Sequence, residues 1–190
     1  MKRPNTGWHY RGYLPHYDQP ELSQFITFRL NDSLPQSLLL ELRQVNANYH
    51  APTTRQVIEK YLDRGSGNCL LSNPGVARIV KECLLAKHDK EYNLHAWVIM
   101  PNHVHVLLST IPENSISNII KSWKSISSRR IYKLTHESRS IWQRDYFDRY
   151  MKSEKQFAAT QLYIEYNPVK AGLVRVPGDW LFSSARKEEE

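Results

Sequence analysis

Two histidines separated by a single residue, His103 and His105, are the first feature of the sequence that could do chemistry. They lie in an apolar segment that is typical of a strand, where alternate side chains point to the same face. Two imidazoles held on one face of a rigid strand can bind a divalent metal ion. The alternative is a pair of surface histidines on a half-buried strand. Taken in isolation, the short motif favours that alternative, because such matches often arise by chance.

A tyrosine and an asparagine near the C-terminus, Tyr163 and Asn167, are the second such feature. They are four residues apart in a segment expected to be helical, so they share one face of that helix. A tyrosine beside an amide oxygen could act as a nucleophile next to a metal ion if this helix packs beside the two histidines. The pair could equally be a partly buried tyrosine and a helix-terminal asparagine, and the spacing does not choose between the two.

Hydrophobic periodicity, together with turn and capping residues, predicts the elements that must position these four residues. In chain order the sequence predicts a strand over 24–30, a helix capped by Asp32 or Ser33 and ending near Val45, a short helix around 57–62, a helix opened by Asn73 and Pro74, two strands over 94–100 and 103–109, a helix over 115–134, and a helix from Ser153 that Pro168 ends at Asn167. Residues 1–23 are expected to form an arm and residues 175–190 a tail. The order predicts one α+β domain over residues 1–190, with helices against an antiparallel sheet.

Length and composition limit the classes of protein that fit. The chain has 190 residues, of which 41% are hydrophobic, enough for one domain with a buried core. We find neither an apolar run long enough to cross a membrane nor the apolar core of a signal peptide. Cys69 and Cys83 form neither a disulfide framework nor a CxxC metal motif, which favours a reducing cytoplasm.

The net charge indicates an anionic partner. Lys and Arg total 26 against 19 Asp and Glu, a formal charge of +7, which favours a polyanion such as a nucleic acid. Basic residues on the long helix could follow a phosphate backbone, and others shortly before the tyrosine helix could line the approach to it. These candidate nucleic-acid contacts are Lys121, Lys124, Arg129, Lys133, Arg144 and Arg149. A solvated helix face explains the helical group equally well.

Two separated motifs resemble one known family. Residues 95–108 (HAWVIMPNHVHVLL) resemble the signature strand pair of the HUH single-tyrosine transposases, the IS200-like superfamily. Residues 163–174 (YIEYNPVKAGLV) resemble the tyrosine helix of one branch, the REP-associated tyrosine transposases. Further matches in 11–35, 141–150 and around Asp179 extend the resemblance over most of the chain.

The resemblance implies a fold and a set of site residues. The fold would be a ferredoxin-like HUH endonuclease domain, in which His103 and His105 bind a divalent metal ion, Mg²⁺ or Mn²⁺. Asn167 occupies the position of a third ligand, where its amide could instead orient a water molecule. Tyr163, which opens the motif, matches the catalytic tyrosine, and Tyr166 does not.

The implied activity is that of a metal-dependent endonuclease and strand transferase. It would nick single-stranded DNA near a REP-like hairpin through a covalent 5′-phosphotyrosine and could rejoin strands. Its partner would be single-stranded or hairpin DNA, with no small-molecule cofactor and no membrane, and a monomer is favoured over a dimer in the bacterial cytoplasm, associated with the nucleoid. Two alternatives stay open: a metal phosphodiesterase that uses water, with Tyr163 only structural, and a catalytically silent hairpin-binding module. No role can be assigned to residues 53–71.

Overall fold

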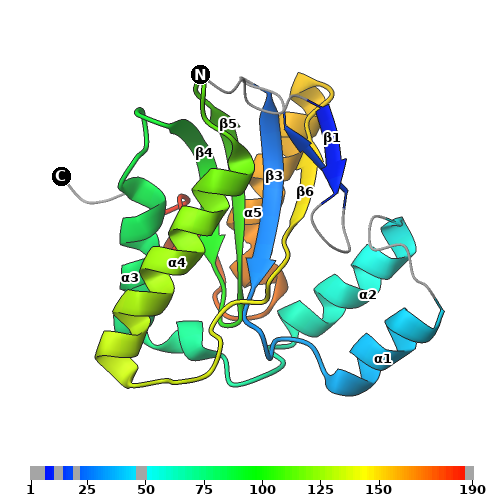
Figure 1. The fold of residues 1–190 in the computed structure, drawn as a ribbon, viewed down its shortest axis with the longest axis vertical. Helices are drawn as coiled ribbons and strands as arrows, with labels where there is room; N and C mark the ends of the chain where they lie inside the picture. Colours follow the sequence, from blue (N-terminus) through cyan, green and yellow to red (C-terminus); the bar gives the residue numbers. More distant parts are fainter. Residues whose placement is uncertain (1–6, 11–14, 19–21, 46–50, 187–190) are drawn as a thin grey trace.

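A four-stranded antiparallel sheet forms the centre of the structure, a computed structural model that describes residues 7–10, 15–18, 22–45 and 51–186 (Figure 1). The strands follow the order β4-β5-β3-β6. Their bounds are β3 Ser23–Arg29, β4 Tyr92–Ile99, β5 His103–Thr110 and β6 Phe147–Tyr150. Helices connect β3 to β4 and β5 to β6, which makes the core a βαββαβ unit of the ferredoxin-like type. The predicted fold class is therefore confirmed.

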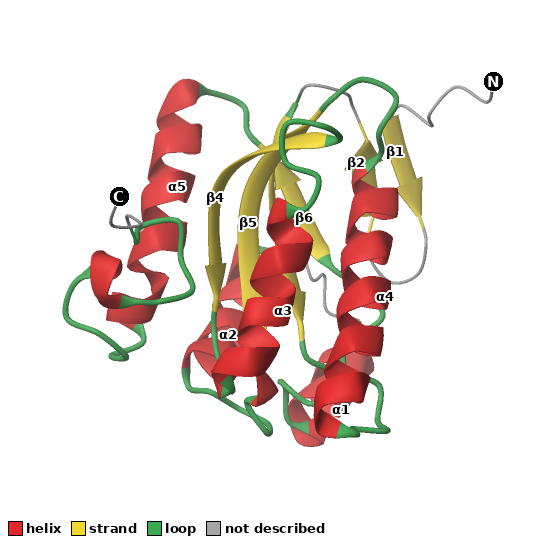
Figure 2. Cartoon of the chain, turned by 90° about the vertical axis from the view of Figure 1, so that its left-hand side faces the viewer, coloured by secondary structure: helices red, strands yellow, loops and turns green. Residues whose placement is uncertain are grey.

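The two faces of the sheet are covered by different helices (Figure 2). Helices α3 (Pro74–Leu85) and α4 (Ile116–Thr135) pack on each other and on one face, and α5 (Glu154–Lys170) packs on the other. Successive side chains of β5 point to opposite faces of the sheet, so alternate residues of this strand lie under different helices. Val104, Val106 and Leu108 are fully buried in the core under α3 and α4. His103 and His105 therefore point toward the α5 side.

Helix α5 begins as predicted but ends later. The Ser153 hydroxyl caps it by accepting a hydrogen bond from the Gln156 amide (3.2 Å). The predicted end at Asn167 is wrong, because the helix continues through Pro168 to Lys170. Proline there removes only the bond to the Ile164 carbonyl, and the Ala171 amide still donates to the Asn167 carbonyl (3.0 Å). The extra turn keeps Lys170 on the helix.

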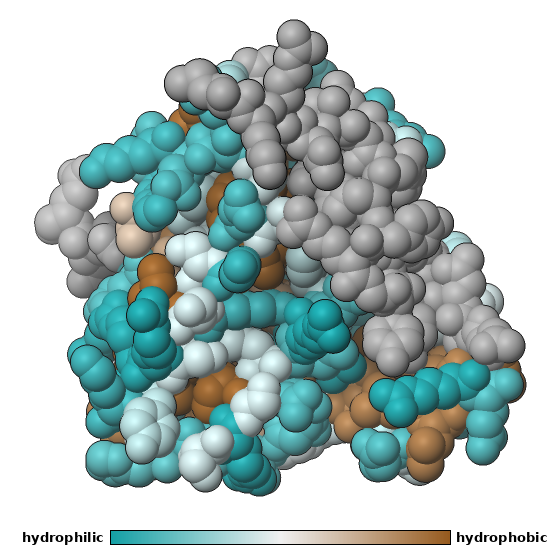
Figure 3. Space-filling model, viewed as in Figure 1, coloured by the Kyte–Doolittle hydropathy of each residue, from teal (hydrophilic) through white to brown (hydrophobic). Residues whose placement is uncertain are grey.

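Helix α1 (Gln36–Gln44) also departs from the expected bounds. Neither predicted cap residue serves it: the Ser33 hydroxyl donates to the Leu30 carbonyl (2.7 Å), and the Asp32 carboxylate accepts from the Asn68 amide (2.9 Å). Helix α2 (Pro52–Asp63) confirms the short helix and packs with α1 around a small apolar cluster of its own. Hydrophobic side chains also gather on the surface over α1 (Figure 3), where Leu40 is 47% exposed.

Both terminal segments contain more structure than the sequence predicted. In the expected arm, β1 (Gly7–Tyr10) pairs with β2 (Pro15–Asp18) in a small antiparallel sheet, while 1–6, 11–14 and 19–21 lie outside the described residues. The expected tail runs along β4: the Ile99 amide donates to the Phe182 carbonyl, and the Ser184 amide to the Trp97 carbonyl, both at 2.9 Å. Within the described part of the chain, no helix combines the length and apolarity needed to cross a membrane.

Candidate active site

The two histidines of β5 meet edge to edge on the α5 side of the sheet. His103 and His105 are 0% and 1% exposed. Their Nε2 atoms lie 3.1 Å apart, and the ring centroids 4.6 Å apart. Strand geometry alone places both rings on this face, since they are two residues apart on a strand paired on both sides by β3 and β4.

A hydrogen-bond chain fixes the orientation of the first ring. The Asn102 side-chain amide donates to the Ser66 carbonyl (2.9 Å), which leaves its oxygen 2.8 Å from Nδ1 of His103. An amide oxygen only accepts, so Nδ1 of His103 carries the proton and Nε2 presents a lone pair. On the second ring, Nδ1 of His105 lies 2.8 Å from the Thr27 hydroxyl, which can donate or accept.

Both imidazoles are neutral at physiological pH. Burial lowers the pKa of His103 to about 3, and the positive charge of Lys170 contributes. Burial also lowers the pKa of His105 well below its ordinary value, helped by His103, Arg55 and Lys170. Metal ligation requires neutral imidazole, so the environment maintains the ligating form.

The lowered pKa values predict acid-sensitive stability. The unfolded chain would bind protons at these histidines near pH 6.5 while the folded protein does not, so stability falls as pH drops below that value. We expect the free energy of unfolding to lose about 1.4 kcal/mol per pH unit for each histidine. Urea unfolding in EDTA at several pH values measures this slope. The double variant His103→Gln/His105→Gln should lose most of it, and an unchanged slope would contradict the assignment.

Tyr163 lies beside the histidine pair. Its ring centroid is 5.6 Å from that of His105 and 6.0 Å, edge-on, from that of Phe25. Its hydroxyl is buried and has no hydrogen-bond partner among the described residues. Burial raises the pKa of Tyr163, and the carboxylates of Glu59 and Asp63 raise it further. The hydroxyl is therefore protonated in this state.

Asn167 completes the group from the next turn of α5. It is fully buried, and within the described part of the chain neither its amide oxygen nor its amide nitrogen has a hydrogen-bond partner. Its amide lies near enough to Tyr163 to oppose the rise in that pKa, yet the two make no hydrogen bond of ordinary geometry. Buried polar atoms without partners are rare in folded proteins. Here three such atoms lie beside the imidazole pair, and binding of a cation and an anionic substrate could satisfy them.

The donor set fits a divalent metal ion of mixed nitrogen and oxygen preference. Two neutral imidazoles and an amide oxygen would leave positions open for substrate, as metal-ion catalysis needs. Among the described residues, no three His, Cys, Asp or Glu side chains converge on one point. An amide, which that set does not include, is therefore the third candidate ligand in this part of the chain.

Charged residues of α2 and the end of α5 border the site, and the sequence analysis did not assign them. The Arg55 guanidinium lies 4.3 Å from the centroid of the Phe147 ring and forms an ion pair with Glu59 (3.0 Å). Lys170 pairs with Asp63 at 2.8 Å. In the sequence, the only signal was that Arg55, Glu59 and Asp63 are spaced four residues apart, which puts them on one face of a helix.

The predicted DNA contacts are dispersed. Arg149, on β6, lies on the site's face, with its guanidinium 5.9 Å from the Phe25 ring. The Lys124 ammonium donates to the carbonyls of residues 143–145, and burial lowers its pKa to about 8, so in this structure it supports a loop. Three others are exposed on α4, across the sheet from the site: Lys121, Arg129 and Lys133. Arg144 is exposed in the loop after α4.

Comparison with known proteins gives a family match. A family model described as "Transposase IS200 like" matches residues 71–167. The REP-associated tyrosine transposase of Escherichia coli (strain K12) is 30% identical over 104 residues, which cover 54% of this chain and 59% of that protein. A putative REP-associated tyrosine transposase of Haemophilus influenzae is 32% identical over 101 residues, or 47% of this chain and 57% of that protein. The matched part is thus less than two thirds of either relative's length.

A solved structure shares the fold. It is described as a REP-associated tyrosine transposase bound to a REP hairpin, and it superposes with a TM-score of 0.54 over 93% of this chain and 81% of that one. The sequence identity is 22%, so this comparison shows the fold alone.

Proposed function

The chain belongs to the family of IS200-like transposases, enzymes that act on DNA, and on that premise we propose that it cuts and rejoins single-stranded DNA through a covalent tyrosine link. One observation carries the proposal. Tyr163 has a buried, unpartnered hydroxyl beside two neutral histidines and an unpartnered amide. A tyrosine with only a structural role would normally donate its hydrogen to a partner.

Each residue of the proposed site would have a distinct role. His103, His105 and Asn167 would hold Mg²⁺ or Mn²⁺, and the bound ion would polarise the scissile phosphate and neutralise its developing charge. Asn102 and Thr27 orient the two imidazoles. Phe25 packs against both the His105 and the Tyr163 rings and holds them at a fixed separation.

The reaction conserves the phosphodiester bond energy. Tyr163 loses its proton and its Oη attacks phosphorus, the bond from phosphorus to the 3′ oxygen breaks, and that oxygen leaves as a 3′-OH. The strand 3′ to the cut stays attached as a 5′-phosphotyrosine. A second 3′-OH can attack the same phosphorus, release the tyrosine and join two strands. Because the free hydroxyl has a raised pKa, its proton must be lost as the charged substrate complex forms.

The proposed substrate is single-stranded DNA next to a REP-like hairpin. The net charge of +7 and the naming of the relatives as REP-associated both support this choice. Because α5 of the same chain brings Tyr163 near His105, the proposed site would need no residue of a second molecule, which supports a monomer. Its place of action would be the bacterial cytoplasm, at the nucleoid.

End-labelled DNA tests the proposal. The protein is incubated with Mn²⁺ and a pool of hairpins carrying single-stranded flanks, then analysed on a denaturing gel. We expect the 3′-labelled product to migrate with the protein and the 5′-labelled product to be released. Cleavage with neither label on the protein would indicate a phosphodiesterase that uses water. Binding without cleavage, with a second metal ion and a wider pool as well, would indicate a hairpin-binding module.

Asn102 offers a test of metal binding that leaves every proposed ligand in place. Removing the group that sets the tautomer of a histidine ligand typically weakens metal affinity by about 10- to 100-fold. We expect that loss in Asn102→Ala, measured as free Mn²⁺ by electron paramagnetic resonance. Asn93→Ala, at an exposed position of the neighbouring strand, is the control. Equal Mn²⁺ affinity in the two variants would show that Asn102 does not orient a ligand.

A further inference from the structure

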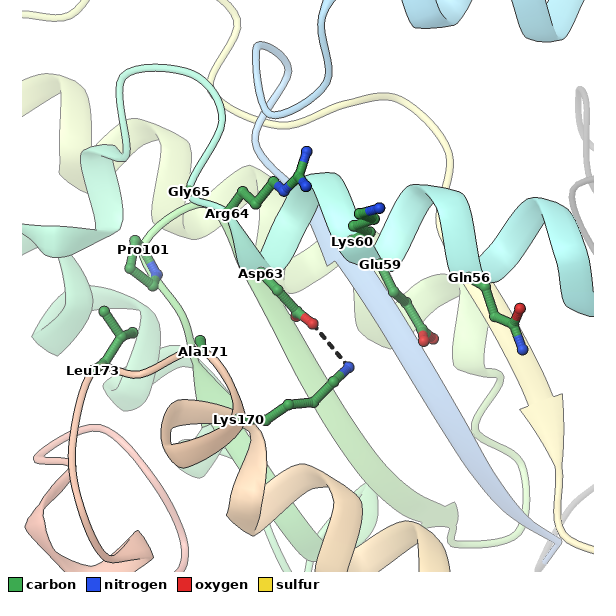
Figure 4. Close-up of a pocket in the computed structure, with 10 residues that line it drawn as sticks. All are labelled: Gln56, Glu59, Lys60, Asp63, Arg64, Gly65, Pro101, Lys170, Ala171 and Leu173. Atoms are coloured by element: carbon green, nitrogen blue, oxygen red, sulfur yellow. Dashed lines mark ion pairs between the residues drawn. The ribbon is translucent and has the colours of Figure 1, made fainter.

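A cavity of about 540 Å³ lies between α2 and the C-terminal end of α5. Glu59 and Asp63 extend from α2 toward the side on which Lys170 lies, whereas Lys60 and Arg64 point away from it (Figure 4). Lys170 extends from α5 on the opposite wall. Among the described residues that line the cavity, Lys170 is thus the cation that faces its interior.

Lys170 is positioned by the same helix that carries the nucleophile. It follows Tyr163 by seven residues, almost two full turns, so both lie on one face of α5. Its ammonium is 5.6 Å from the centroid of the Tyr163 ring. The side chain is 52% exposed, which leaves it accessible to a ligand in the cavity. Its charge also reaches the histidine pair, where it helps to lower both pKa values.

Asp63 holds the ammonium with only half of its carboxylate. Oδ2 accepts from Lys170 at 2.8 Å, while Oδ1 is buried and meets no partner in the part of the chain that the structure describes. A carboxylate and a phosphodiester offer an ammonium the same kind of anionic oxygen. The ion pair therefore occupies a position where a DNA phosphate could take the place of the carboxylate.

Resting on the proposed function, we infer that Lys170 binds the backbone phosphate next to the one that Tyr163 attacks, and that Asp63 occupies Lys170 until DNA displaces it. The strand would then pass through the cavity between α2 and α5. This gives part of the unassigned segment 53–71 a role, since Asp63 belongs to it.

Binding measurements with a Tyr163→Phe background test this without covalent product. Removing Lys170 alone would also leave the negative charge of Asp63 without its ion-pair partner. The effect of Lys170→Gln is therefore measured in the Asp63→Asn variant. We expect Asp63→Asn to bind a hairpin with single-stranded flanks about 3-fold more tightly. Adding Lys170→Gln to it should weaken binding about 10-fold and reduce the slope of log K against log salt by about 0.7. As a control, Lys90→Gln removes the same charge at an exposed residue just before β4, at the end of that strand away from the cavity.

Neutral methylphosphonates placed one at a time along the strand locate the contact. At the phosphate bound by Lys170, the methylphosphonate should weaken DNA binding by the Asp63→Asn variant. It should have no further effect in the double variant Asp63→Asn/Lys170→Gln. Lys170→Arg should retain binding, which separates loss of charge from loss of fold.

Three results would overturn the inference: equal effects of Lys170→Gln and Lys90→Gln, weaker binding by Asp63→Asn, or no phosphate whose effect depends on Lys170. If the covalent adduct forms while one of these holds, the inference fails and the proposed function stands. If the wild type neither binds nor cleaves any strand, the proposed function fails and this inference falls with it.

Discussion

Tyr163→Phe is expected to abolish the covalent protein–DNA adduct and to reduce strand cleavage by more than about 1,000-fold. The change removes one oxygen atom and keeps the ring that packs against Phe25 and His105. Because the lost hydroxyl is buried without a partner, its removal should leave the free energy of unfolding unchanged within about 1 kcal/mol or raise it. Denaturing gels with end-labelled hairpin DNA measure the first effect, and urea unfolding the second.

Tyr166→Phe is the matched control. Tyr166 lies on the same helix three residues later, and it is 53% exposed, away from the histidine pair. It should form the adduct at the wild-type rate within about 2-fold, as surface changes outside a site usually do little. Adduct formation by Tyr163→Phe, or its loss in Tyr166→Phe, would move the nucleophile elsewhere. Hydrolysis that survives in Tyr163→Phe would identify water as the nucleophile.

Substituting either histidine of the pair should remove metal-dependent activity. We expect His103→Gln and His105→Gln each to lower adduct formation by more than about 100-fold, because a lost ligand acts more strongly than a lost orienting group. EDTA should abolish the wild-type reaction, and Mn²⁺ should restore it in the wild type alone. Adduct formation is followed on denaturing gels over a range of Mn²⁺ concentrations.

His95→Gln controls for the general effect of losing an imidazole on this face. His95 is half-buried on β4, with Nε2 2.9 Å from the Ser109 hydroxyl and its ring 5.1 Å from that of Phe157. It lies away from the Tyr163 site, so its variant should keep the Mn²⁺ requirement and the activity. Full activity in EDTA, or equal losses in all three variants, would refute metal binding by His103 and His105.

The parts of the site that follow from local periodicity were predictable from the sequence. Strand alternation placed His103 and His105 on one face, and helical spacing did the same for Tyr163 and Asn167. That these two faces meet depends on α5 packing against the sheet, which the motif resemblance implied and the periodicity did not.

The parts that depend on contacts between distant segments were not predictable. Asp63 and Lys170 are 107 residues apart in sequence, yet they form an ion pair. The position of Lys170 itself depended on α5 continuing past Pro168, against the local preference. For Lys124 the prediction failed in the opposite way. Its spacing on the helix predicted an exposed surface cation, but the loop at 143–145 covers its ammonium.

The backbone hydrogen bonds that the C-terminal segment makes to β4 also bear on the tendency of the molecule to self-associate. β4 is an edge of the sheet, and residues 182–184 satisfy backbone groups of Trp97 and Ile99 there. An uncovered edge offers its free amides and carbonyls to other chains and is a common starting point for aggregation. A protein shortened before Phe182 would expose such an edge next to the apolar Val98. We therefore expect residues 182–184 to oppose self-association by covering part of this edge, independently of any chemistry at Tyr163.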